Sequence, residues 1–202
     1  MRNALLRLAR AMDFAARKHR DQRRKGAAEE PYINHPAEVA RLVAEATGGR
    51  DVTVVLGALL HDTLEDTETT RAELRREFGA DVAALVAEVT DDKRLSKRER
   101  KRRQVERASR KSSRARMIKT ADKTSNLRSL AQSPPLAWDA RRRREYAEWA
   151  AQGVAGCRGV NRRLEAAFDA AYRQALRGFG RDQPRFARGG RPRKGSTTRT
   201  PS

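Results

Sequence analysis

Apolar residues in this sequence recur three or four positions apart, and no stretch sustains the alternation of apolar and polar residues that marks a β-strand. Helix signals separate the apolar segments: Thr70 with Glu73 forms a capping box, Gly79 follows that short segment, and Ser133-Pro134-Pro135 ends a later one. This spacing is typical of a helical fold without a sheet. We therefore predict an all-α protein with about eight or nine helices in one domain.

The apolar segments give approximate positions for the helices. We expect them at residues 4–19, 36–47, 52–61, 71–78, 81–89, 97–107, 113–131 and 137–177, the last as one helix or a pair. In the first of these, helical spacing gathers an apolar face from Leu5, Leu8, Met12, Ala15 and Ala16. In the last, we expect Trp138, Tyr146 and Trp149 to be buried.

The charge of the chain is strongly positive and unevenly distributed. Lys and Arg number 46 against 26 Asp and Glu, which gives a formal net charge of +20, while only 38% of the residues are hydrophobic. Residues 178–202 hold seven Lys or Arg, one acidic residue, five Gly and three Pro, a composition that predicts a disordered basic tail. Residues 1–177, the predicted folded domain, keep +14 of that charge, so their basicity needs its own explanation.

Several protein classes are excluded by the same composition. The longest apolar run, from Val52 to Leu60, is far shorter than the roughly 20 residues of a membrane-spanning helix. The N-terminus mixes Arg2 and Arg7 into its apolar residues and lacks a signal-peptide core. With Cys157 as its one cysteine, the chain has neither an intramolecular disulfide nor a Cys-rich zinc site. We expect a soluble cytoplasmic protein.

The segment His61-Asp62-Thr63-Leu64-Glu65-Asp66 places four ionisable side chains directly after an apolar run. At helical spacing Glu65 lies one turn from His61, and Asp66 one turn from Asp62. Imidazole and carboxylate groups are ligands suited to Mn²⁺, Zn²⁺ or Fe²⁺. His35 and Asp122, from two other predicted helices, could complete a set of four ligands. Spacing alone leaves a solvated helix end with a hydrogen-bonded histidine as the commoner explanation of such a His-Asp pair.

Five segments, in their order along the chain, carry a resemblance to a known family. They are Pro31-Tyr32-Ile33-Asn34-His35-Pro36, His61-Asp62-Thr63-Leu64-Glu65-Asp66-Thr67, Val89-Thr90-Asp91-Asp92-Lys93, Ala121-Asp122-Lys123 with Asn126-Leu127-Arg128, and Glu145-Tyr146-Ala147-Glu148-Trp149-Ala150-Ala151-Gln152. The chain resembles the hydrolase domain of the RelA/SpoT alarmone enzymes. It is most similar to the small stand-alone hydrolases of the metazoan SpoT homologue type, and the resemblance runs from about residue 4 to residue 176.

This resemblance implies an HD-domain fold, entirely helical, that removes the 3′-pyrophosphate of ppGpp or pppGpp to yield GDP or GTP plus pyrophosphate. It implies one Mn²⁺ held by His35, His61, Asp62 and Asp122. Glu65 and Asp66 match the pair that positions and activates the attacking water. The substrate-binding positions of the family correspond to Arg24, Lys25, Lys97, Asn126, Arg142 and Tyr146.

The cationic side chains among these substrate-binding positions suit a polyanionic substrate, because Arg binds phosphate oxygens with two parallel hydrogen bonds and Lys offers a point charge. We interpret three other cationic residues, Arg102, Arg103 and Arg110, as part of a solvated surface. The chain departs from the family pattern at Thr124-Ser125 and in the loop 26–30. Both segments are expected to border the nucleotide and to affect its orientation rather than the metal chemistry.

Three alternatives remain open from the residues. One is an HD phosphohydrolase that acts on another nucleotide such as NADPH. Another is weak RNA binding through the Arg-Gly segment of the tail, which would depend on salt. The third is a catalytically inactive regulatory HD domain. Synthesis of the alarmone is not expected, because no segment resembles the synthetase domain of the bifunctional enzymes.

Overall fold

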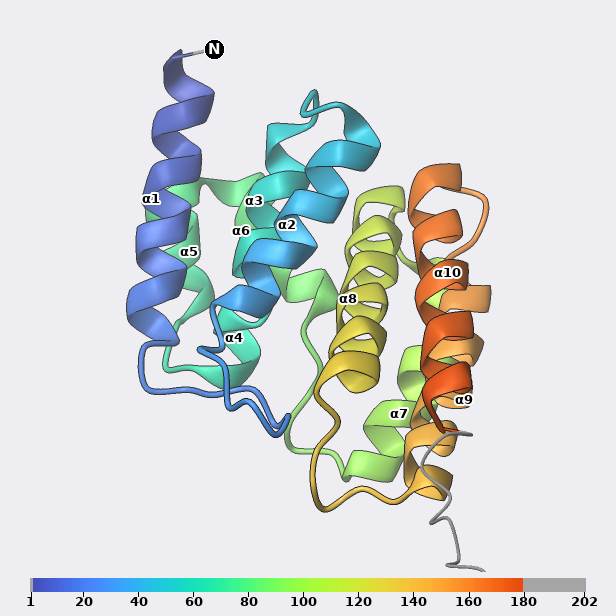
Figure 1. Cartoon of the computed structure of the whole chain (residues 1–202). Coiled ribbons are helices and arrows are strands. Elements are labelled where there is room, and N and C mark those ends of the chain that lie inside the picture. The colour runs from blue at the N-terminus through green and yellow to red at the C-terminus, as the bar shows by residue number, and fades with distance from the viewer. Residues whose placement is uncertain (1, 180–202) are drawn as a thin grey trace, which may run out of the picture.

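The computed structural model describes residues 2–179, and within that range the chain forms helices joined by loops (Figure 1). The helices are α1 (Arg2–Lys18), α2 (Asn34–Thr47), α3 (Val52–Leu60), α4 (Thr63–Asp66), α5 (Arg71–Phe78), α6 (Ala80–Val89), α7 (Lys97–Glu106), a 3₁₀ turn at Ala108–Arg110, α8 (Ser113–Gln132), α9 (Ala140–Ala155) and α10 (Arg162–Phe179). Between residues 2 and 179 the β-pairing amounts to one isolated bridge, between Arg23 and Pro31. The prediction of an all-α fold is confirmed.

Local signals in the sequence explain where several helices begin and end. The Thr70 side chain accepts a hydrogen bond from the Glu73 backbone N–H at the start of α5, as the capping box predicts. Gly48 ends α2 with a left-handed φ of 61°, a conformation that glycine adopts without strain. The last predicted segment forms a pair of helices, and α10 continues past the predicted domain end at residue 177 to Phe179. The rest of the predicted tail lies outside the described residues.

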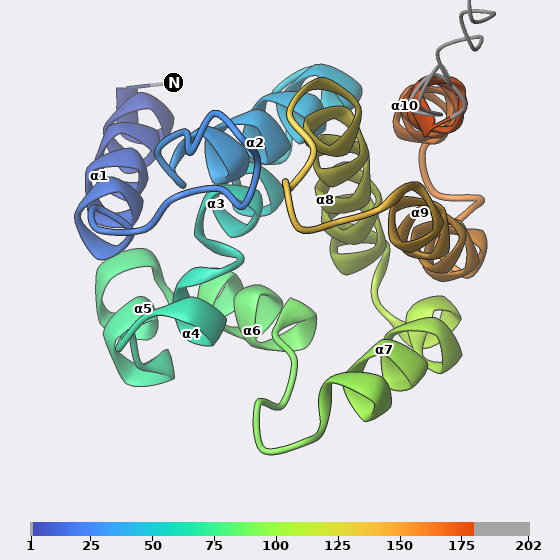
Figure 2. The same cartoon turned by 60° about the horizontal axis from the view of Figure 1, so that its bottom comes forward.

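Two hydrophobic clusters form the core, and α8 belongs to both. The larger cluster joins α1, α2, α3, α5 and α6 to Ala115, Ile118 and Ala121 from the first half of α8. The smaller one packs Leu127 and Leu130 from its second half against α9 and α10. Figure 2 shows α8 between α2 and α9, with α7 beside α9 and far from α1. The long helix α8 thus holds the two halves of the protein together.

The apolar face predicted for the first helix packs only in part. Ala15 is buried and Ala16 half-buried as expected, but Leu5 is 70% exposed and Leu8 and Met12 are also exposed. Ala11 and Phe14, which are not part of the predicted face, are buried. The ring of Phe14 meets Phe78 of α5 edge to face, with centroids 5.2 Å apart. The small alanines let α1 approach α3 closely, so the buried face lies beside the leucine-rich one.

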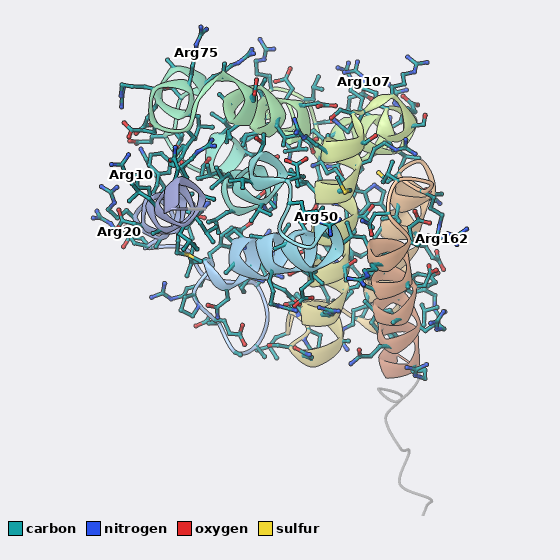
Figure 3. All side chains as sticks on the ribbon, turned by 90° about the horizontal axis from the view of Figure 1, so that it is seen from above. Arg10, Arg20, Arg50, Arg75, Arg107 and Arg162 are labelled. Carbon is teal, nitrogen blue, oxygen red and sulfur yellow. The ribbon has the colours of Figure 1, made fainter. Side chains whose placement is uncertain are left out.

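Charged side chains cover the outside of the described helices. Figure 3 shows Arg10, Arg75 and Arg162 at the periphery of the molecule, and all three are exposed. Arg102 pairs with Glu99 and Glu106 on the surface of α7, which fits its interpretation as a solvated residue. Among the described helices, none combines the length and apolarity that crossing a bilayer requires.

Candidate active site

Two histidines and two carboxylates from three parts of the fold meet beside a large cavity, whose lining residue Tyr32 bonds one of them. His35 lies in the first turn of α2, His61 and Asp62 form the turn between α3 and α4, and Asp122 lies midway along α8. His35 Nε2 is 3.3 Å from Asp122 Oδ1 and 3.6 Å from Asp62 Oδ2. His61 Nε2 is 3.1 Å from the same Asp62 oxygen. The structure therefore brings together all four predicted metal ligands.

The ligand atoms of His35, His61 and Asp62 lie within 4.8 Å of one another, close enough to share one cation. His61 donates its Nδ1 proton to the backbone carbonyl of Ala58 at 2.8 Å, which leaves a lone pair on Nε2. That Nε2 atom is buried and forms no hydrogen bond within the described residues, although Asp62 Oδ2 lies 3.1 Å away. A buried imidazole nitrogen that makes no hydrogen bond and faces carboxylates is the arrangement that a divalent metal satisfies, so these residues fit a metal site.

The environment sets the charge of these groups. Burial lowers the pKa of His35, which favours the neutral imidazole that a metal requires. Burial alone would raise the pKa of Asp122, but Lys123 and His35 hold it well below its usual range, and the group stays ionised. Lys123 Nζ lies 3.0 Å from Asp122 Oδ2. The cluster thus combines the neutral imidazole of His35 with the ionised carboxylate of Asp122. Burial alone would lower the pKa of His61, but the neighbouring Asp62 carboxylate raises it.

The two predicted catalytic carboxylates follow in α4 but face different partners. Glu65 accepts a hydrogen bond from the Asp91 backbone N–H at 3.1 Å, and burial raises the pKa of Glu65 above its ordinary value. Asp66 Oδ1 forms a 2.6 Å ion pair with Lys93. The backbone carbonyl of Asp66 accepts a hydrogen bond from Gln22 at 2.7 Å, which ties the end of α4 to the loop after α1.

The large cavity has a volume of about 720 Å³, a size suited to a nucleotide. It is lined by residues from the 23–32 loop, α4, α7, the second half of α8 and α9. All six predicted substrate-binding residues line it, together with Glu65: Arg24, Lys25, Lys97, Asn126, Arg142 and Tyr146. The structure therefore gathers these residues from distant parts of the sequence into one site.

The lining of this cavity is cationic and partly aromatic. Eight lining residues are Lys or Arg and four are acidic. Arg142 lies over the Trp138 ring at 5.0 Å, and Lys101 lies over the Trp149 ring at 4.6 Å. Trp138, Tyr146 and Trp149 are half-buried: they line the cavity and also pack against the smaller hydrophobic cluster, so their predicted burial is only partial. A row of aromatic faces between cations suits a base attached to phosphates.

Comparison with known proteins agrees with this site. The family model described as "HD domain" matches residues 11–150. The guanosine-3′,5′-bis(diphosphate) 3′-pyrophosphohydrolase MESH1 of Homo sapiens is 52% identical over 167 residues, which cover 83% of this chain and 93% of that protein. The Mus musculus protein of the same name is 50% identical with the same coverage. The chain belongs to the HD-domain family of MESH1 type.

A solved structure also resembles this HD domain. It is described as a metazoan ortholog of SpoT that hydrolyses ppGpp and plays a role in starvation responses. The two structures superpose with a TM-score of 0.80 at 44% sequence identity, over 83% of this chain and 94% of that one. The resemblance in sequence is therefore matched by the same arrangement of helices.

The HD domain also uses residues that the sequence did not single out. Tyr32 lines the cavity and donates a 2.6 Å hydrogen bond from its hydroxyl to Asp62. Lys101 lines the cavity one turn along α7 from Lys97. Lys93 holds Asp66. Tyr32 and Lys93 lie within the segments that carried the family resemblance, so their position beside the predicted ligands was the available signal.

Ser125 occupies a different place in the HD domain from the one expected. Its hydroxyl lies 2.9 Å from His35 Nδ1, on the side of the imidazole opposite the His-Asp cluster, and 2.7 Å from Glu38. The departure from the family pattern at this position therefore contacts a predicted metal ligand and concerns more than the predicted nucleotide orientation. Gly26 of the other departing segment does line the large cavity.

Proposed function

We propose that this HD domain hydrolyses the 3′-pyrophosphate of ppGpp or pppGpp, giving GDP or GTP plus pyrophosphate, and so degrades the alarmone. The observation that carries the proposal is the junction of two sites. A nucleotide-sized cationic cavity has Tyr32 in its wall, and the Tyr32 hydroxyl bonds Asp62 of the His-Asp cluster. MESH1 proteins that are about half identical to this chain bear the name of this activity.

We propose further that the cluster holds one Mn²⁺ through His35, His61, Asp62 and Asp122. Mn²⁺ suits this set better than Mg²⁺, because the harder ion prefers oxygen ligands and two of these ligands are imidazoles. Such an ion, when bound, would lower the pKa of a coordinated water and offset negative charge at the scissile phosphate.

Glu65 is the better-placed proton acceptor of the two carboxylates. It lines the cavity, and its raised pKa brings it closer to the range in which a general base works efficiently. Its hydrogen bond from the Asp91 N–H fixes one oxygen and leaves the other free to receive a proton from water. Asp66, held by Lys93, would orient the same water from the end of α4.

The remaining lining residues would bind and orient the substrate. Arg24 donates a hydrogen bond to Asn126 at 3.2 Å and lies over the Tyr32 ring, so these residues form one wall beside the cluster. Lys97 and Arg142 lie on α7 and α9. A substrate with two diphosphate groups would be concentrated by this positive potential before it reaches the cluster.

The test is a product analysis of the purified full-length chain with Mn²⁺. Incubation with ppGpp should release GDP and pyrophosphate in equal amounts, as read by anion-exchange chromatography. GDP, which lacks the 3′-pyrophosphate, should remain unchanged and serves as the control. NADPH is included in the same panel, because release of orthophosphate from NADPH together with no release of pyrophosphate from ppGpp would assign the domain to a different phosphohydrolase activity. RNA binding through the predicted tail concerns residues outside the described range and stays a prediction.

A further inference from the structure

A hydrogen-bonded chain of three side chains lies behind the predicted metal ligand His35. His35 Nδ1 and Ser125 Oγ are 2.9 Å apart, and Ser125 Oγ donates to Glu38 Oε2 at 2.7 Å. His35 is 3% and Ser125 1% exposed, so water does not replace these bonds readily. Glu38 lies one turn after His35 on α2, and Ser125 comes from α8.

The far end of this chain is fixed by arginine. Arg128 Nη1 donates to Glu38 Oε1 at 2.8 Å, and Arg128 lies one turn after Ser125 on α8. Glu38 therefore uses one oxygen for Arg128 and the other for Ser125. Paired in this way, Glu38 is an ionised acceptor without a proton to give.

The direction of every bond in the chain follows from counting protons. A serine hydroxyl has one proton, and Ser125 gives it to Glu38. The bond between Ser125 and His35 must then be donated by His35 from a protonated Nδ1. A neutral imidazole with its proton on Nδ1 presents a lone pair on Nε2, the atom that faces Asp62 and Asp122.

We propose that Ser125 and Glu38 are positioning residues that fix the tautomer and ring orientation of His35 for metal binding. This inference rests on the proposed metal site. Outer residues that accept the second N–H of a metal-binding histidine are general in metalloproteins, and their loss costs roughly 10–100-fold in metal affinity or activity. In this protein the acceptor is Ser125, which in turn donates its own proton to the Glu38 carboxylate.

The test measures the Mn²⁺ dissociation constant of the full-length chain by isothermal titration calorimetry. Ser125→Ala and Glu38→Ala should each weaken Mn²⁺ binding by about tenfold or more. Two matched variants serve as controls. Thr124→Val removes a neighbouring buried hydroxyl that bonds only within α8, at Thr120, and Glu45→Ala removes a glutamate of α2 that pairs with Arg41 on the surface. Both controls should stay within about twofold of the wild type.

The double variant Ser125→Ala/Glu38→Ala shows whether the two residues act together or separately on His35. If Glu38 acts through Ser125, the double variant should bind Mn²⁺ about as weakly as Ser125→Ala alone, whereas additive losses of affinity would contradict an action of Glu38 through Ser125. If Ser125→Ala does not fold, as judged by circular dichroism, the Glu38→Ala value decides, since Glu38 is only half-buried. Wild-type affinity in all of these variants would overturn the inference and leave the proposed function intact. A wild type that binds no Mn²⁺ would instead contradict the proposed metal site itself.

Discussion

The Tyr32 hydroxyl donates a 2.6 Å hydrogen bond to Asp62 Oδ2, the oxygen that also faces His35 and His61. Tyr32 lines the large cavity, so this bond connects the surface that would receive a nucleotide to the cluster that would hold a cation. Burial raises the pKa of Tyr32, which keeps the hydroxyl protonated and therefore a donor. This hydrogen bond occupies Asp62 Oδ2 and fixes the orientation of the Asp62 carboxylate toward the two imidazoles.

Replacement of Tyr32 by Phe tests this connection. The ring and its packing remain, but the hydrogen bond to an ionised carboxylate is lost. Because such bonds contribute about 1.5–3 kcal/mol, we expect Mn²⁺ affinity or kcat to fall on the order of tenfold or more. Tyr172→Phe, on α10 and stacked on Phe168, is the control and should behave as the wild type. Equal behaviour of the two variants would show that the Tyr32 hydroxyl does not orient Asp62.

Glu65→Gln and Asp66→Asn test whether the α4 carboxylates act on water. Each amide keeps the shape of the side chain and its hydrogen-bonding capacity but removes the charge. Loss of a general acid–base group is expected to lower kcat about 10²-fold or more, with Mn²⁺ still bound. Metal content measured on the same samples separates this outcome from a structural one. Loss of metal in both variants would mean that these carboxylates are ligands.

Lys25→Ala, Lys97→Ala and Arg142→Ala test the cationic cavity. Because these contacts exist before the transition state, each variant should raise KM for ppGpp, by about tenfold, more than it lowers kcat. Added salt should weaken substrate binding less in each variant than in the wild type, since fewer ionic contacts remain to be screened.

Arg102→Ala is the matched control for this series. Arg102 lies on the same helix as Lys97 but pairs with Glu99 and Glu106 on the surface. It should leave KM within about twofold, an effect below ~0.5 kcal/mol. Removal of residues 180–202, which lie outside the described range, should do the same. A series in which KM and its salt dependence match those of Arg102→Ala would disprove the role of the cavity cations.

The stability of the protein should depend on pH through Glu38. Burial alone would raise the pKa of Glu38, but hydrogen bonds from Arg128 and Ser125 hold it below its ordinary value of 4.5. A carboxyl with a lowered pKa in the folded state stabilises the protein above its unfolded pKa, and that stabilisation is lost as the pH falls through the folded value. Urea denaturation should therefore find Glu38→Gln less stable than the wild type at pH 7, with a gap that closes below about pH 4.5. A gap that does not change with pH would assign the loss to packing.

Signals close together in the sequence predicted much of this fold. Thr70 caps α5 as expected, and the spacing of His61, Asp62, Glu65 and Asp66 survives as a nearly continuous helical backbone, in which the Asp66 N–H donates to the Asp62 carbonyl. His35 and Asp122 were candidates to complete the ligand set from their residue types, the family resemblance implied their role, and the fold brings them to the same place. Motifs of this kind can be recognised in a sequence because metal binding and proton transfer each require particular residue types.

The interactions that the sequence did not predict join distant segments. Ser125 reaches Glu38 across 87 positions, and Lys93 reaches Asp66 across 27. The predicted packing face of α1 was partly wrong, because Ala11 and Phe14 are buried beside the predicted Ala15 while Leu5 and Leu8 stay exposed. Periodicity reports which residues share a helix face, but not which helix lies opposite or how closely it approaches.

Chelation and restoration of metal, with pyrophosphate release from ppGpp as the readout, tests the central claim most directly. The account predicts that the wild type treated with excess chelator releases no pyrophosphate and recovers when Mn²⁺ is returned. His61→Ala and Asp122→Ala should remain inactive under the same treatment while keeping their helical circular dichroism. Pyrophosphate release that persists in chelator, or in either variant, would contradict a metal-dependent hydrolase at His35, His61, Asp62 and Asp122.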